Sequence, residues 1–257
     1  AFFIFSFLTS VCYITNDFTD RERDKVNKLK KEVKQFSKRQ VILLNFLLHV
    51  FFVFLFFFTQ FFNIFFLIYL IFFYLYNFIF KKFFLIDLFF LTSFYLIRIY
   101  LGADIINISI TFWFILFFTF LFLLLSILKR ITQINFNNSN DISKIISYSK
   151  KDLIFLKKLV VFSAIISLVI FSLYILNTKN IQIIKILSSQ NYNYELTFRA
   201  LIFILITYFF WLIRLIRLVF LGKISMGLYS YIIRDKISYF IGIFIFVILF
   251  LNKYLIF

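Results

Sequence analysis

The sequence predicts an all-α fold, a multi-pass transmembrane helical bundle. Hydrophobic residues make up 63% of the 257 residues, whereas a soluble domain contains about 45–50%. They gather in runs that approach the roughly 20 residues a helix needs to span a bilayer. Lys and Arg are concentrated in every second connection between these runs, as expected when successive connections lie on opposite sides of a membrane.

Eight hydrophobic runs follow one another along the chain, and we expect each to form one membrane-spanning helix. The first run is shorter than the others. Their approximate bounds are 1–15, 41–59, 61–80, 83–101, 109–128, 158–176, 198–221 and 237–252. Because the chain begins with Ala1 inside an apolar run, we expect further residues upstream. We interpret 1–257 as a single membrane domain that lacks its first helix.

The positive charge, a net +17, predicts the orientation of the bundle. Connections rich in Lys and Arg are expected on the cytoplasmic side. These connections are 16–40, 81–82, 129–157 and 222–236. We therefore expect a bacterial-type cytoplasmic membrane, with a polar cavity open to the cytoplasm. Such charge also suits the anionic head groups of membrane lipids. Nucleic-acid binding would need a soluble basic face, which the sequence lacks.

An amide and three carboxylates follow directly after the first hydrophobic run: Asn16, Asp17, Asp20 and Asp24. At about 100° per residue, Asn16, Asp20 and Asp24 fall within about 80° of one another on a helix, with Asp17 at the edge of that face. Mg²⁺ prefers oxygen ligands and is usually held by one or two carboxylates together with substrate phosphates. The face therefore predicts a site for Mg²⁺ and a diphosphate-bearing substrate.

Other metal ligands and nucleophiles are scarce in this sequence. Cys12 is the only cysteine, so there is no disulfide framework and no Cys/His spacing typical of a metal site. His49 is the only histidine and lies inside a hydrophobic run. We expect it to be a packed helix residue bonded to a partner.

The aspartate spacing also resembles a known motif. Asn-Asp-x-x-Asp-x-x-x-Asp after an apolar helix is similar to the first aspartate motif of the UbiA-type intramembrane prenyltransferases. Further residues, in the same order along the chain, resemble the branch that includes decaprenyl-phosphate phosphoribosyltransferase and bacterial relatives with a fused HAD-like domain upstream. These residues are Tyr76-Asn77, Lys81, Asp87, Tyr95, Arg98, Gly102, Lys129-Arg130, Tyr148, Asp152-Leu153, Trp211, Arg214 and Arg234-Asp235-Lys236.

The resemblance implies nine spans, of which eight are visible here, and a set of site residues. Asp17, Asp20 and Asp24 would be catalytic and, with Asn16, would bind Mg²⁺. Substrate would be bound by Asn16, Lys81, Asp87, Arg98, Lys129 and Arg130. Several of these assignments have a plainer alternative, which for the aspartates is a solvated helix end. Arg98 lies near the far end of its run and suits a snorkelling anchor, and Lys129-Arg130 suits ordinary flanking charge.

The end of the run at 109–128 separates two activities of the superfamily. Aromatic prenyltransferases carry a second aspartate motif there, which holds a second metal ion, but this chain has Lys129-Arg130. Two cations suit a phosphate group and cannot hold Mg²⁺. By resemblance, we expect phosphoribosyl transfer from 5-phosphoribosyl diphosphate to a polyprenyl phosphate whose tail lies among the helices.

Two alternatives remain open. Prenyl transfer from a polyprenyl diphosphate to an aromatic or other small acceptor would use the same aspartates. The other alternative is a catalytically inactive, lipid-binding membrane protein. It is motivated by Met226-Gly227-Leu228, where relatives often carry Asp-Asp-Pro.

Overall fold

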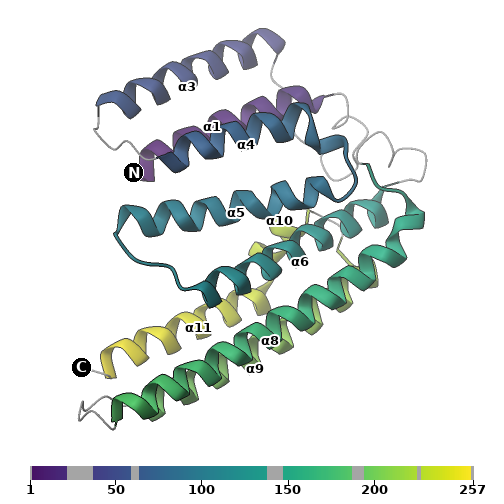
Figure 1. The fold of residues 1–257 in the computed structure, drawn as a ribbon. Coiled ribbons are helices and arrows are strands. Elements are labelled where there is room, and N and C mark those ends of the chain that lie inside the picture. The colour runs from purple at the N-terminus through teal and green to yellow at the C-terminus, as the bar shows by residue number, and fades with distance from the viewer. Residues whose placement is uncertain are drawn as a thin grey trace. The chain divides into compact units, whose positions relative to one another are not determined.

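The computed structural model describes residues 2–21, 37–58, 64–137, 147–186, 194–224 and 227–255. All regular elements within these ranges are helices, which confirms the predicted all-α class for the described part of the chain. The long helices, drawn in Figure 1, are α1 (Phe2–Thr19), α3 (Lys38–Phe58), α4 (Ile64–Phe78), α5 (Ile86–Ile105), α6 (Phe112–Phe136), α8 (Leu153–Ile186), α9 (Tyr194–Phe220) and α11 (Lys236–Leu255). The short ones are η1 (Phe80–Lys82), η2 (Lys150–Asp152) and α10 (Leu228–Arg234).

Each hydrophobic run coincides with one of these long helices. Among the described residues, four helical stretches are long and apolar enough to cross a membrane: Ile86–Ile105, Phe112–Phe136, Lys150–Asn177 and Phe198–Phe220. Shorter apolar stretches lie in α3, α4 and α11. These helices are compatible with a membrane protein, while the number of eight spans stays a prediction.

Large apolar side chains on the helix surfaces fit the same interpretation. Phe46 of α3 is 65% exposed, and Phe240 and Phe246 of α11 are 68% and 67% exposed. Soluble monomers rarely expose contiguous apolar patches of large area. A bilayer would remove these side chains from water.

Two helices extend beyond the hydrophobic runs that predicted them. α8 continues through 177–186, which the pattern assigned to a connection. The polar residues there interrupt the apolar run, but they include no Pro or Gly to break the backbone hydrogen bonds. α6 likewise continues past residue 128 to Phe136, so Lys129 and Arg130 lie within the helix and do not close it.

The chain folds into two compact units. The first comprises Ala1–Thr111 and Gln133–Asp152, and the second comprises Phe112–Thr132 and Leu153–Phe257. Residues of α6 therefore belong to both units. The single membrane domain expected over 1–257 stays a prediction.

The first unit is built on α4, which packs against α1 and α5, while α3 packs against α1. Phe66, Tyr69 and Phe73 recur along α4 at intervals of three and four residues, which places them on one helix face. They join Leu8 of α1 and Phe94 of α5 in one buried cluster. The core of this unit is therefore largely aromatic.

The helices α1 and α4 run parallel. Near their beginnings, the rings of Phe5 and Tyr69 lie 5.3 Å apart. At their ends, the Thr19 hydroxyl donates to the Asn77 side-chain oxygen at 3.1 Å. The C-terminal end of α1 is thereby held beside the end of α4 and the residues of η1 that follow it.

His49 is packed and partner-bonded, as predicted. Its Nε2 lies 2.6 Å from the Tyr74 hydroxyl, and its Nδ1 lies 2.8 Å from the Asn45 carbonyl oxygen. Both ring nitrogens are therefore satisfied between α3 and α4, which explains how the imidazole is tolerated in a hydrophobic run.

The second unit contains an antiparallel pair, α8 and α9, with α11 packed against α9. The hydroxyls of Ser167 and Tyr208 lie 2.9 Å apart, and the Lys157 ammonium lies 5.2 Å from the centre of the Phe220 ring. Residue numbers thus rise along α8 as they fall along α9. The beginning of α8 therefore lies beside the end of α9.

Gly222 explains where α9 ends. Its φ is 65°, a left-handed conformation that residues with a Cβ adopt at a cost. Its N–H donates to the Val219 carbonyl, and the Lys223 N–H donates to the Leu218 carbonyl, both at 3.0 Å. This pair of bonds satisfies the last carbonyl groups of a helix and stops its growth.

Candidate functional site

The predicted oxygen-rich face lies at the C-terminal end of α1. The Asp20 N–H donates to the Asn16 carbonyl at 2.9 Å, so the two residues are one helical turn apart. Asp20 is buried, with 8% of its surface exposed, whereas Asp17 is exposed. Asn16 and Asp20 share a face as predicted. Asp24 lies outside the described residues.

Lys81 of η1 joins Asn16 and Asp20. Its ammonium donates to the Asn16 side-chain oxygen at 2.8 Å and to the Asp20 carboxylate, with which it forms an ion pair. The same ammonium lies 5.8 Å from the centre of the Tyr76 ring. The structure therefore brings together three of the predicted site residues: Asn16 of α1, Asp20 directly after α1, and Lys81 of η1, about sixty positions further along the chain.

This placement of Asp20 opposes the electrostatics of a helix end. The C-terminus of a helix carries partial negative charge, so a carboxylate there is unfavourable without a compensating cation. Lys81 supplies that cation. The ion pair therefore compensates the buried carboxylate at this helix end.

Asn77 adds an amide beside this cluster. Its side-chain oxygen accepts from Thr19, while its side-chain nitrogen is buried without a hydrogen-bond partner in the described structure. Buried polar atoms are nearly always paired, so an unpaired donor needs an explanation. A substrate oxygen would satisfy it. In the sequence, Asn77 was visible only as a position matched by the family resemblance.

Asp87 lies in the first turn of α5 and is buried, with 1% of its surface exposed. The Tyr148 hydroxyl donates to its carboxylate and accepts the Leu85 N–H at 3.2 Å. The adjacent Ser147 hydroxyl donates to the Lys81 carbonyl at 3.3 Å. Residues 147 and 148 therefore hold the backbone at Lys81 and at Leu85, between the η1 turn that presents Lys81 and the start of α5.

This bracing suggests a positioning role for Asp87, whereas the sequence-based expectation was direct substrate binding. A carboxylate at a helix N-terminus is also favoured by the helix dipole. Tyr148 was visible in the sequence only as a matched position. Its partnership with Asp87 could not be found there, because no local spacing relates residues about sixty positions apart.

Arg98 lies elsewhere on α5. Its guanidinium donates to the Tyr69 hydroxyl at 2.9 Å and lies 5.5–5.8 Å from the ring centres of Phe5, Tyr69 and Tyr95. Eleven residues separate it from Asp87, a rise of about 16 Å along the helix. Arg98 is therefore held among aromatic rings, away from the Lys81–Asp20 pair.

Lys129 and Arg130 belong to the second unit. Arg130 is buried, with 4% of its surface exposed, and the Lys129 ammonium lies 5.6 Å from the centre of the Tyr229 ring. A side chain that only anchors the helix to lipid head groups would be fully exposed, and neither of these two side chains is. That both face Asp20 stays a prediction.

If these two cations bind a phosphate group, neutralising them should weaken transfer. We expect Lys129→Gln combined with Arg130→Gln to lower turnover by well over tenfold, because charged hydrogen bonds contribute about 1.5–3 kcal/mol each. The rate of phosphoribosyl transfer in purified membranes that contain the variant measures this loss of turnover. The control is Lys150→Gln with Lys151→Gln, an equal change of charge at exposed positions. Normal turnover in the first variant would contradict the two-phosphate arrangement.

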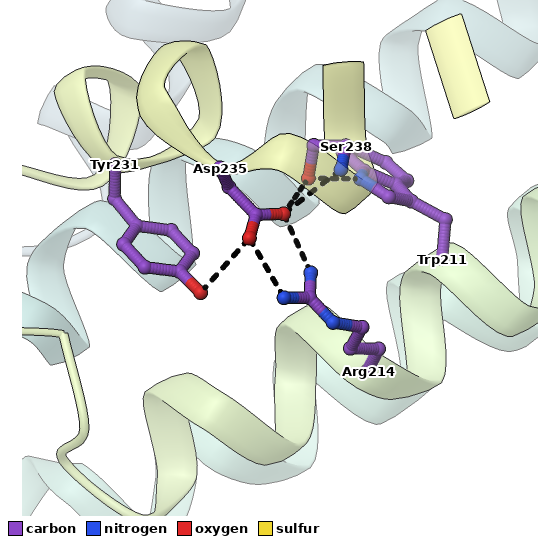
Figure 2. Close-up of polar contacts among 5 residues, drawn as sticks. All are labelled: Trp211, Arg214, Tyr231, Asp235 and Ser238. Carbon is purple, nitrogen blue, oxygen red and sulfur yellow. Dashed lines mark hydrogen bonds and ion pairs between the residues drawn. The ribbon is translucent and has the colours of Figure 1, made fainter. Parts of the chain in front are cut away.

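The second unit contains its own polar network, shown in Figure 2. The Arg214 guanidinium donates two hydrogen bonds to the Asp235 carboxylate, at 2.6 and 2.7 Å. Asp235 caps the N-terminus of α11 by accepting the Ser238 N–H at 2.9 Å and its hydroxyl at 2.6 Å. The Trp211 indole N–H donates to the Ser238 hydroxyl at 3.0 Å. This network fixes the corner where α10 meets α11 against α9.

The Arg214 guanidinium and the Ser238 donors hold the pKa of the Asp235 carboxyl well below its usual range. A carboxyl with a lowered pKa stabilises the fold above its unfolded pKa and loses that effect only as the pH falls through its folded pKa. We therefore expect the network to stay intact from pH 8 down to about pH 3, where a carboxyl with an ordinary pKa would be mostly protonated. The fluorescence of Trp211, whose indole belongs to the network, reports on its integrity as the pH falls. The Trp113→Phe substitution removes the other tryptophan, so that Trp211 is the only emitting one. A transition centred near pH 4 would mean that Asp235 titrates normally.

Comparison with models of protein families found no match, and comparison with curated proteins found none either. Among the described residues, no group of three or more His, Cys, Asp or Glu side chains is placed to hold a metal ion. The chemistry of this site is therefore argued from its own residues.

Proposed function

We propose that the chain is a Mg²⁺-dependent intramembrane transferase similar to the UbiA-type enzymes. Its specific reaction would be phosphoribosyl transfer from 5-phosphoribosyl diphosphate to a polyprenyl phosphate. A phosphate oxygen of the lipid would attack the sugar carbon, and the bond from that carbon to diphosphate would break. The acceptor, a polyprenyl lipid, would lie among the helices.

One observation carries this proposal: Asn16 and Asp20 direct one oxygen each at a single cation, the Lys81 ammonium. Amide and carboxylate oxygens that converge on one point are the donors Mg²⁺ prefers. These residues therefore fit a metal-bound diphosphate, with Asp17 and Asp24 as candidate further carboxylates. When bound, Mg²⁺ would supply positive charge for the leaving diphosphate.

The surrounding residues support the same chemistry. Lys81 is placed to leave the Asp20 carboxylate for a phosphate oxygen, since an ammonium is a common phosphate ligand. The unpaired Asn77 nitrogen would donate to the same group. Asp87 would hold the Lys81 turn in place through Tyr148. Lys129 and Arg130 would bind the second phosphate.

The experiment that tests the proposal compares two labelled donors. Membranes containing the chain are incubated with a polyprenyl phosphate and labelled 5-phosphoribosyl diphosphate, or with labelled polyprenyl diphosphate and small acceptors. We expect label in the lipid fraction from the first donor alone, and loss of that label when Mg²⁺ is chelated. Transfer from the second donor would favour prenyl transfer. No transfer in either arm would favour an inactive lipid-binding protein.

The proposal also includes a cytoplasmic membrane and a site that faces the cytoplasm. We expect reporter fusions at Asn107 and Gln190 to read outside, and fusions at Ser139 and Gly227 to read inside, because positive connections stay in the cytoplasm. Gln190 and Ser139 lie outside the described residues. Alkaline phosphatase and fluorescent-protein fusions measure the four positions. The reverse pattern would overturn the orientation.

A further inference from the structure

A groove between α8 and α9 has no role in the proposed transfer. Its volume is about 550 Å³, within the range of known ligand sites. One wall is a single face of α8, formed by Val161, Ala164, Ile165 and Leu168. The opposite wall is a face of α9 that includes Phe209 and Ile213. Nearly the whole length of the groove is apolar.

One end of the groove is cationic. Arg217 of α9 lines it there and is exposed. The Lys157 ammonium lies 5.2 Å from the centre of the Phe220 ring, which lines the same end. Arg217 and Phe220 are three residues apart on α9 and so are neighbours on the helix surface. Two cations therefore lie at the end where α8 begins and α9 stops.

Among the described side chains of the second unit, no free carboxylate neutralises the charge of this end. Of the described side chains in that unit, Asp235 alone carries a carboxylate. Arg214 already binds this carboxylate through two hydrogen bonds. Lys158 and Lys223 add further positive charge close by in the sequence. An anion from outside the chain would complete the site.

We propose that this groove binds one anionic phospholipid of the bilayer, independently of the transfer reaction. Its acyl chain would lie along the apolar faces of α8 and α9. Its phosphate would lie between Arg217 and Lys157, since Arg pairs with phosphate through two hydrogen bonds and Lys adds a point charge. The cationic end joins the connections expected on the cytoplasmic side, where anionic lipids attract basic residues.

Native mass spectrometry of the whole chain in detergent, with equal limiting amounts of phosphatidylglycerol and phosphatidylcholine, tests the proposal. We expect one retained phosphatidylglycerol, preferred about tenfold. Arg217→Gln with Lys157→Gln should reduce the preference to about twofold or less. The control is Lys150→Gln with Lys151→Gln, an equal change of charge at exposed positions on the same expected side that do not line the groove. Excess inorganic phosphate should not displace the lipid.

A second variant keeps every charge and tests the groove itself. Ile165→Trp fills it and should lower retention of either lipid severalfold. The control is Phe162→Trp, at an exposed position that does not line the groove. The proposal is overturned if the wild type shows no preference, if both charge variants lose it equally, or if Ile165→Trp retains lipid normally. Displacement by inorganic phosphate would show a free-anion site and would also overturn it.

Discussion

Asp20→Asn should lower Mg²⁺-dependent transfer by about a hundredfold or more while leaving the helices folded. The substitution keeps the shape of the side chain but removes the charge that would hold a metal-bound diphosphate at the end of α1. A loss of about 2.7 kcal/mol in binding of the metal-bound diphosphate corresponds to a hundredfold. Transfer assays on purified protein at saturating Mg²⁺ measure the effect.

The matched control is Asp104→Asn, an exposed aspartate at the end of α5. It should keep normal activity. Circular dichroism and gel filtration of both variants separate loss of chemistry from loss of fold. Wild-type turnover in Asp20→Asn would refute the assignment of the metal site. It would leave the lipid groove of α8 and α9 untouched, because that proposal does not depend on transfer.

Breaking the pair between Arg214 and Asp235 should cost on the order of 3 kcal/mol of unfolding free energy. Asp235→Ala removes two charge-assisted hydrogen bonds and the N-cap of α11 together. Arg214→Gln leaves the carboxylate without its main partner. Unfolding in mixed micelles with rising dodecyl sulfate concentration, followed by Trp211 fluorescence in the Trp113→Phe background, measures both losses.

A double-mutant cycle isolates the pair itself. If the two residues act on each other, the double variant should lose at least 1 kcal/mol less than the sum of the single losses. Ser230→Ala, at an exposed position of α10, serves as the control and should change stability little. Additive losses would mean that Asp235 acts only as a helix cap and that Arg214 stabilises the unit in another way.

Helix positions were predictable because apolar run length and the helical period are local properties. α4 and α5 coincide with their runs to within a few residues. The prediction failed at 177–186, where polarity suggested a connection but no residue breaks a helix. Hydrophobicity reports where a chain prefers lipid, whereas the backbone hydrogen bonds of α8 continue until something interrupts them.

The candidate site was predictable only in part. Asn16 and Asp20 share a helix face because they are four positions apart, and a local rule decides this. The roles suggested for Lys81 and Asp87 came from resemblance. Their observed partners, Asp20 and Tyr148, needed the folded chain.

The all-α class, the positions of the long helices, the shared face of Asn16 and Asp20, and a packed His49 could all be predicted from the amino-acid order. Each depends on spacing within one helix or on the composition of one segment. The contacts of Lys81 with Asp20, of Tyr148 with Asp87 and of Arg214 with Asp235 became visible only in the folded chain. These partners lie on different elements, and the packing of large side chains between helices brings them together. No period in the sequence encodes which helix faces which.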